Sequence, residues 1–486
     1  MAKLWAFLWR IKTLVGVALA LLLAGFFLTF AKRPMEIGID AAYDEGGHRL
    51  AVTQTVLYRN PGQKPLGFLL FHIQANAYQS AKTAPVQKGK EKMSYPSGFS
   101  PGGLTLDQVL VNGEEAAYSI FGEQGSLLQI ELFEPLKEEA EIRLSYTVQL
   151  PNARGRLGWF GDGVRLGGAF AVPARLMEDG SFDQSGLPAV GDPNLGEIAD
   201  YELTLRLPTS FVAAGPGLEE PADDGSWRFR LRDAPELFIT LSKNYCVAAS
   251  RANGVRVRAF APTEEGAALL AAQGARAVEV YSELFGPYPR EDYILATGDL
   301  SSLGMEAPGF SLIDARLLRG QSALLEYVVA HETAHQWWGM AVISDQVRHA
   351  WQDEALAEYS ALLYMEATKG EGGFVNHYNA LVRPAAEDSA LKGLPIDLPL
   401  SSFESEELYS RLVYRLGCAM WHDLRVEMGN AGFFRALSGY YRQHKLQWAE
   451  PIDLLGALGP RGARRAKDWL SGEAQPSHSS MAPWGN

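Results

Sequence analysis

Cysteine is nearly absent from this chain, which holds only Cys246 and Cys418 among 486 residues. Two residues so far apart provide neither a disulfide framework nor the spacing of a cysteine-ligated metal site. An excess of basic residues is also lacking, because 57 acidic side chains outnumber 44 basic ones and give a formal net charge of −13. This balance argues against nucleic acid or an anionic lipid surface as the main partner.

Internal repeats and low-complexity tracts are missing as well, which excludes solenoid and fibrous classes. The hydrophobic content of 47% and the charged content of 21% are ordinary for globular proteins. A chain of this length can bury two or three full-sized cores. The sequence therefore predicts an ordinary multidomain globular protein.

One long apolar run is present near the start of the chain, where residues 13–31 carry no charge. A helix of that length about spans a bilayer core of roughly 30 Å. We expect residues 1–35 to form an uncleaved membrane anchor, which predicts a single-pass protein of the cell membrane with the remaining chain outside the cytoplasm. A cleaved signal peptide is the alternative, although the run ends without a small-x-small cleavage site.

The remaining chain divides by its hydrophobic period. Between residues 36 and 260, apolar and polar residues alternate in short runs separated by glycine- and proline-bearing turns, as in Tyr201 to Leu207. This pattern predicts an antiparallel β-sandwich. Residues 261–472 are mainly helical in pattern, with short strands expected near Tyr293 to Thr297 and Phe310 to Ile313, and residues 473–486 form a tail.

The strongest chemical motif lies in one of these helical runs, predicted over Ser322 to Trp338. His331 and His335 are four residues apart, so both imidazoles share one helix face and can converge on one ion. Glu332 lies beside that face and can act as the general base on a zinc-bound water without being a ligand itself. This spacing is the H-E-x-x-H arrangement of zinc hydrolases.

A third ligand follows after residues 336–353, at the start of a second helical run. If that helix returns antiparallel to the first, Glu354 completes a His₂Glu set with an open fourth position, which is typical of catalytic zinc. Glu358 lies one turn further on and either orders a ligating histidine from behind or is a plain surface charge. The sequence therefore predicts one Zn²⁺ bound by His331, His335 and Glu354.

These segments resemble the gluzincin aminopeptidases, the family of alanyl aminopeptidase and leukotriene hydrolase. Residues 331–339, HETAHQWWG, are similar to the family's HELAHQWFG, and residues 351–359 are similar to its W-x-x-E-x-x-A-x-Y segment, with Asp353 in place of the usual Asn. The resemblance is specific from about residue 280 to 420. It implies a thermolysin-like, mainly helical zincin catalytic domain behind the β-sandwich.

The resemblance also implies roles for further residues. Gly304, Met305 and Glu306 match the G-A-M-E-N strand, whose glutamate receives the free amino group of the substrate, although Ala307 replaces its Asn. Tyr414 matches a tyrosine that stabilises the oxyanion. Tyr409 matches a second active-site tyrosine of some members.

The resulting expectation is a zinc-dependent aminopeptidase that acts on peptides. The large C-terminal helical domain of longer family members does not follow residue 472, so a more open site is expected. An endopeptidase or an epoxide-type hydrolase could use the same zinc site, and a membrane-anchored binding module without catalysis is the alternative from another class. Thermolysin-type peptidases share the His₂Glu set but lack an upstream G-M-E strand.

Overall fold

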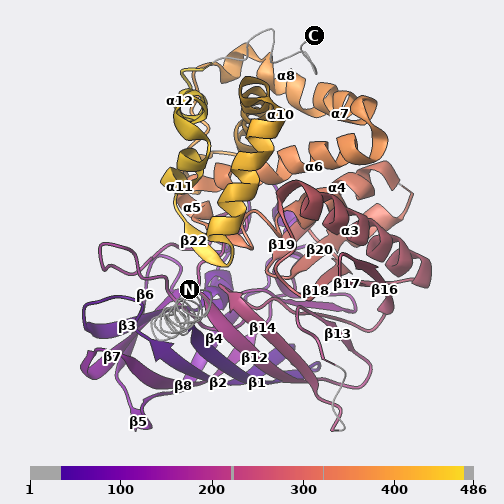
Figure 1. Cartoon of the computed structure of the whole chain (residues 1–486). Helices are drawn as coiled ribbons and strands as arrows, with labels where there is room; N and C mark the ends of the chain where they lie inside the picture. The colour runs from indigo at the N-terminus through magenta and orange to yellow at the C-terminus, as the bar shows by residue number, and fades with distance from the viewer. Residues whose placement is uncertain (1–33, 220–223, 321, 475–486) are drawn as a thin grey trace, which may run out of the picture.

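The computed structural model describes residues 34–219, 224–320 and 322–474. Sheets make up the N-terminal part of the molecule, and helices make up most of the C-terminal part above them (Figure 1). The strands of the N-terminal part are β1 Met35–Asp44, β2 Arg49–Arg59, β3 Leu66–His72, β4 Gly103–Val111, β5 Glu114–Glu115, β6 Tyr118–Phe121, β7 Leu127–Leu136, β8 Glu139–Gln149, β9 Leu157–Phe160, β10 Gly163–Leu166, β11 Val172–Pro173, β12 Ala199–Arg206, β13 Val212–Ala214, β14 Trp227–Ala234 and β15 Thr240–Ser242.

The largest sheet has the strand order β14-β12-β1-β2-β8-β4-β5. Strict alternation of buried and exposed residues along β1 shows that only one face of this sheet is covered, as the period of two predicts. The pairing is not wholly antiparallel, because β1 pairs in parallel with β12. That pairing needs a long connection, since β12 begins more than 150 residues after β1 ends, and no local pattern could have predicted it.

Two smaller sheets, β13-β15-β10-β9 and β11-β3-β7-β6, belong to the same N-terminal part. Side chains from all three sheets join one apolar core, which includes Ile37, Leu144, Phe71 and Leu166. Two short helices lie between β3 and β4, η1 at Gln74–Gln79 and α2 at Glu91–Ser94.

A mixed sheet connects this part to the helices. Its order is β16-β17-β18-β20-β19, with β16 Cys246–Ala252, β17 Val255–Ala261, β18 Asp292–Gly298, β19 Gly304–Ala307 and β20 Phe310–Asp314. The strands expected near residues 293–297 and 310–313 are therefore present. Strand β18 is one residue longer at both ends, and β20 is one residue longer at its C-terminal end. Strand β19 lies at the edge of the sheet and contacts helix α4.

The helices of the C-terminal part follow the predicted runs closely, with different ends. A kink occurs within α10, where Gly429 has a φ of 68°, a left-handed conformation that glycine adopts at no steric cost. The helices are α3 Glu264–Phe285, η2 Ala315–Leu318, α4 Ser322–Ala334, α5 Gln346–His349, η3 Ala350–Gln352, α6 Glu354–Lys369, α7 Glu371–His377, η4 Tyr378–Val382, α8 Arg383–Ala386, η5 Ser389–Leu391, η6 Leu400–Ser402, α9 Glu406–Tyr409, η7 Ser410–Leu416, α10 Gly417–His444, α11 Pro451–Ala457 and α12 Gly459–Leu470. A two-stranded pair, β21 Val342–Ser344 and β22 Gln447–Ala449, ties the loop after α4 to the end of α10.

The predicted location as a single-pass protein of the cell membrane is contradicted. Across residues 34–474, leaving out the short undescribed gaps, no helix is both long enough and apolar enough to cross a bilayer. The predicted span at residues 13–31 and most of the predicted tail at 473–486 lie outside the described residues.

Candidate active site

Helices α4 and α6 pack against each other and bring the three predicted ligands together. The Nε2 atoms of His331 and His335 lie 3.1 Å apart. Glu354, the first residue of α6, places its Oε2 atom 3.5 Å from Nε2 of His331 and 3.3 Å from Nε2 of His335. The packing of α6 on α4 is what closes this set.

The three residues fit a zinc ion. All three side chains are buried, and their ligand atoms lie within 4.8 Å of one another. The Oε2 atom of Glu354 is enclosed and has no hydrogen-bond partner among the described residues. Two imidazole nitrogens and one carboxylate oxygen facing one point, with no proton donor between them, form the donor set of a catalytic zinc site.

Glu358 lies behind the first histidine. One of its oxygens is 3.1 Å from Nδ1 of His331, and the other accepts a hydrogen bond of 2.8 Å from the Tyr327 hydroxyl and pairs with Arg415. This leaves Nε2 of His331 free to face the other ligands. The geometry is that of a carboxylate which orients a ligating imidazole.

Asp353 occupies the same position behind the second histidine. Its Oδ1 atom lies 2.5 Å from Nδ1 of His335, and both side chains are almost fully enclosed. In the sequence, Asp353 was notable only because it replaces the usual asparagine. In the structure, its carboxylate contacts the ring of His335.

Glu332 lies next to the ligands and against the edge strand β19. A Cβ atom on Gly304 would stand 2.2 Å from the Glu332 carboxylate, so a larger residue there would push this side chain out of its position. Burial raises the pKa of Glu332 to about 7, while His331 and His335 act in the opposite direction. A carboxylate with such a pKa can accept a proton and return it near neutral pH.

Glu306 projects from the same edge strand into the site. One carboxylate oxygen of Glu306 lies within 4.8 Å of a carboxylate oxygen of Glu332 and of a ring nitrogen of His335. The Glu306 side chain is buried. Burial raises the pKa of Glu306 well above its usual range, although His335 opposes the shift. A cationic group of a substrate would reverse this cost by pairing with the ionised carboxylate.

The two predicted tyrosines lie on the far side of the ligands, in and next to the π-helical segment η7. The ring of Tyr414 stacks on the imidazole of His331 at 5.7 Å and meets the ring of Tyr409 edge-on at 5.4 Å. Burial raises the pKa of Tyr414 and the Glu354 carboxylate adds to this rise, so its hydroxyl keeps its proton. Short π-helical segments within α-helices frequently occur at functional sites.

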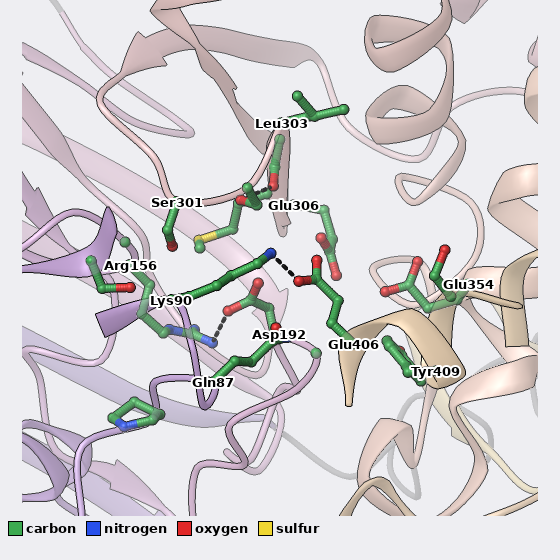
Figure 2. Close-up of a pocket in the computed structure, with 18 of the residues that line it drawn as sticks. Gln87, Lys90, Arg156, Asp192, Ser301, Leu303, Glu306, Glu354, Glu406 and Tyr409 are labelled. Carbon is green, nitrogen blue, oxygen red and sulfur yellow. Dashed lines mark hydrogen bonds and ion pairs between the residues drawn. The ribbon is translucent and has the colours of Figure 1, made fainter. Parts of the chain in front are cut away.

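These side chains open into one cavity of about 650 Å³ that lies between the N-terminal sheets and the helices. Gly304, Met305 and all the other predicted site residues line it. Figure 2 shows that the wall opposite Glu306 and Glu354 comes from the N-terminal part and carries Lys90, Arg156 and Asp192. Lys90 forms an ion pair with Glu406 across the cavity, and Asp192 lies 3.9 Å from Arg156 (Figure 2).

Sequence reasoning missed this second wall. Asp192 lies in a loop without periodic pattern, and Lys90 lies in an insert between two strands, so neither gave a signal. Burial raises the pKa of Asp192, with Arg156 opposing the shift. A half-buried carboxylate that faces the metal ligands is a candidate for contact with a substrate.

Comparison with known proteins agrees with the motifs. Residues 271–469 match the model of the Peptidase family M1 domain. Aminopeptidase M1 of Arabidopsis thaliana is 24% identical over 318 residues, which are 59% of this chain and 34% of that protein. Aminopeptidase 2, mitochondrial, of Saccharomyces cerevisiae is 25% identical over 250 residues, which are 49% of this chain and 26% of that protein. The chain thus spans about a third of the first of these relatives and about a quarter of the second.

The fold has close counterparts among solved structures. An M1 zinc metallopeptidase from Deinococcus radiodurans superposes with a TM-score of 0.64 at 20% sequence identity, over 92% of this chain and 95% of that one. This match establishes the shared fold. The name of the yeast relative assigns that protein to mitochondria, not to the cell membrane.

Proposed function

We propose that this chain is a zinc aminopeptidase that removes N-terminal residues from peptides, on the premise that its residues 271–469 match the Peptidase family M1 domain. The observation that carries the proposal is the convergence of His331, His335 and Glu354 in a cavity that also holds Glu332 and Glu306. A binding module without catalysis would have no need of a buried base beside a ligand set.

We also propose the finer division of the molecule. Residues 36–260 form a β-sandwich domain, and residues 261–472 form a thermolysin-like catalytic domain. The shared apolar core of the first three sheets and the packing of α4 on α6 support two parts. The mixed sheet crosses the proposed boundary, because β16 and β17 join one sheet with β18, which pairs with β17.

His331, His335 and Glu354 would hold the zinc ion. When bound there, zinc supplies a Lewis acid that polarises a substrate carbonyl and lowers the pKa of a water. Glu358 and Asp353 keep the two imidazoles turned so that both Nε2 atoms face this position.

Proton transfer falls to Glu332. Its carboxylate takes a proton from the attacking water and gives it to the leaving amine, so that one buried group serves both steps. The Tyr414 hydroxyl donates to the oxygen on which negative charge develops, and it can do so because burial keeps it protonated. A well-placed donor of this kind typically contributes about 3–4 kcal/mol to the transition state.

Recognition of the free N-terminus falls to Glu306. The substrate's ammonium group would pair with this buried carboxylate, and Gly304, Met305 and Tyr409 would line the space for the first residue. Peptides with a blocked N-terminus would lose this pairing and leave the carboxylate without a partner.

One panel of substrates tests the proposal. Zinc content should be one ion per chain, and hydrolysis of amino-acyl amides should stop when a chelator removes zinc. Glu306→Gln should raise KM for free amino-acyl substrates by about tenfold or more, since a hydrogen bond to a charged group is worth about 1.5–3 kcal/mol, and should leave N-acylated substrates unaffected.

The outcomes separate the candidates. Cleavage of N-acylated peptides as fast as free ones would identify an endopeptidase on the same zinc site. Turnover of an epoxide but of no peptide would identify the epoxide-type hydrolase. A zinc-free wild-type chain would contradict the central claim.

A further inference from the structure

A buried row of polar side chains runs from the N-terminal sheets to the second zinc ligand. Asn194 lies in the loop between β11 and β12, Gln346 begins helix α5, and Asp353 directly precedes α6. These three side chains and His335 are at most 6% exposed. Side chains so enclosed need internal partners, and each of the four makes at least one polar contact to the next in the row.

The first link fixes the orientation of the Gln346 amide. The backbone N–H of Asn194 donates to Oε1 of Gln346 at 2.7 Å, and the Asn194 side-chain amide donates to the same oxygen at 3.2 Å. A backbone N–H can only donate, so Oε1 must face Asn194. The Nε2 group of Gln346 therefore faces Asp353, and it donates to Oδ2 of that carboxylate.

The second link fixes what residue 353 must be. One of its oxygens accepts from Gln346, and the other lies 2.5 Å from Nδ1 of His335. When Nδ1 carries the proton and donates to Asp353, Nε2 of His335 is left as an acceptor toward His331 and Glu354. An asparagine at this position would turn an NH₂ group against the NH₂ group of Gln346, because its own oxygen is needed by the histidine.

The backbone around the row leaves room for this arrangement. Gly339 has a φ of +97°, and a Cβ atom there would stand 2.5 Å from Oδ2 of Asp353. Ion pairs with the N-terminal part hold α5 in place, at 3.1 Å between Arg348 and Asp183 and at 4.0 Å between Asp345 and Arg175.

We propose that this oriented hydrogen-bond chain, Asn194 to Gln346 to Asp353 to His335, makes the N-terminal sheets part of the zinc-retaining machinery. It fixes His335 in the tautomer that can bind metal, and it requires aspartate rather than asparagine at residue 353. Asp353 and Gln346 are positioning residues, and the inference rests on the zinc site of the proposed function.

A double-mutant cycle tests the polarity of the chain. Asp353→Asn sets two amides against each other, and Gln346→Glu sets two carboxylates against each other. In the double variant, the carboxylate at position 346 can accept from Asn194 and from the amide NH₂ at position 353. The amide oxygen at position 353 still accepts from His335. Each single variant should release zinc to a coloured chelator about 10–100-fold faster than wild type, the usual effect of removing such a partner. The double variant should return to within about threefold of wild type.

A matched control and a second readout separate positioning from general loosening. Arg290→Met removes two hydrogen bonds to the backbone of Arg232 and Asp233, also between the sheets and the helical part but away from this row, and should leave zinc release unchanged. The unfolding midpoints of the metal-free proteins report folding alone. They should not follow zinc release across the cycle.

The inference fails if Asp353→Asn retains zinc as wild type does, or if the two single effects add in the double variant. A wild-type chain without zinc would instead overturn the proposed function. The two failures are therefore distinguishable.

Discussion

The two walls of the cavity are built on different principles. The helical wall holds the proposed zinc ligands and Glu332 on α4, on the turn that directly follows it and on α6. Each imidazole there has a carboxylate behind it, and the proposed ligands are at most 9% exposed. The opposite wall comes from loops of the N-terminal part, where Asp192 is only paired at 3.9 Å with Arg156. From this comparison we expect the chemistry on the helical wall, whereas the loop wall would adjust what binds.

The largest effect should come from Glu332 on the helical wall. Glu332→Gln removes the base but no ligand, so kcat should fall by about 10²–10⁴-fold while zinc stays bound. Steady-state kinetics on an amino-acyl anilide, together with metal analysis, measure both. Glu366→Gln removes a carboxylate from α6 that pairs with Arg425 outside the cavity, and it should keep its activity. Full turnover by Glu332→Gln would contradict the role of Glu332 as the general base and the assignment of the chemistry to the helical wall.

A smaller loss is expected at Tyr414, on the same wall. Tyr414→Phe should lower kcat by about 10²–10³-fold with little change in KM, because its hydroxyl acts on charge that exists only in the transition state. Tyr441→Phe is the control, since it removes a hydroxyl that donates to the backbone of Pro287 at 2.7 Å, away from the cavity. A rise in KM without a fall in kcat would instead assign Tyr414 to substrate binding.

The smallest effect should come from the loop wall. Asp192→Asn keeps the shape of the side chain and removes its charge, so KM for free amino-acyl substrates should rise by about tenfold at most, the size of one lost hydrogen bond to a charged group of about 1.5 kcal/mol. Initial rates over a range of substrate concentrations measure it. A loss in kcat as large as that of Glu332→Gln would show that both walls take part in the chemistry.

Much of the helical wall could be predicted because its information is local. Four residues of helix place His331 and His335 on one face whatever the rest of the chain does. The strands of the N-terminal part were equally readable, since alternating burial along β1 follows a period of two. Their partners were not, as the parallel pairing of β1 with β12 shows.

For some positions the sequence pointed to a residue, but only the structure shows which contacts that residue makes. The sequence marked Asp353 as unusual, yet only the fold brings it to His335 on one side and Gln346 on the other. Gly304 was predicted as a substrate-binding residue, and the structure adds that a side chain there would displace the Glu332 carboxylate.

The sequence alone predicted His331, His335 and Glu332 as a zinc site with its base, because residue spacing within a helix is a local property. It also determined the family resemblance, which residues 271–469 bear out. Only the tertiary structure decided the second wall of the cavity and the chain from Asn194 to His335. Those contacts join residues about 150 positions apart, such as Asn194 and Gln346, and a contact between such distant segments leaves no period or spacing in the sequence.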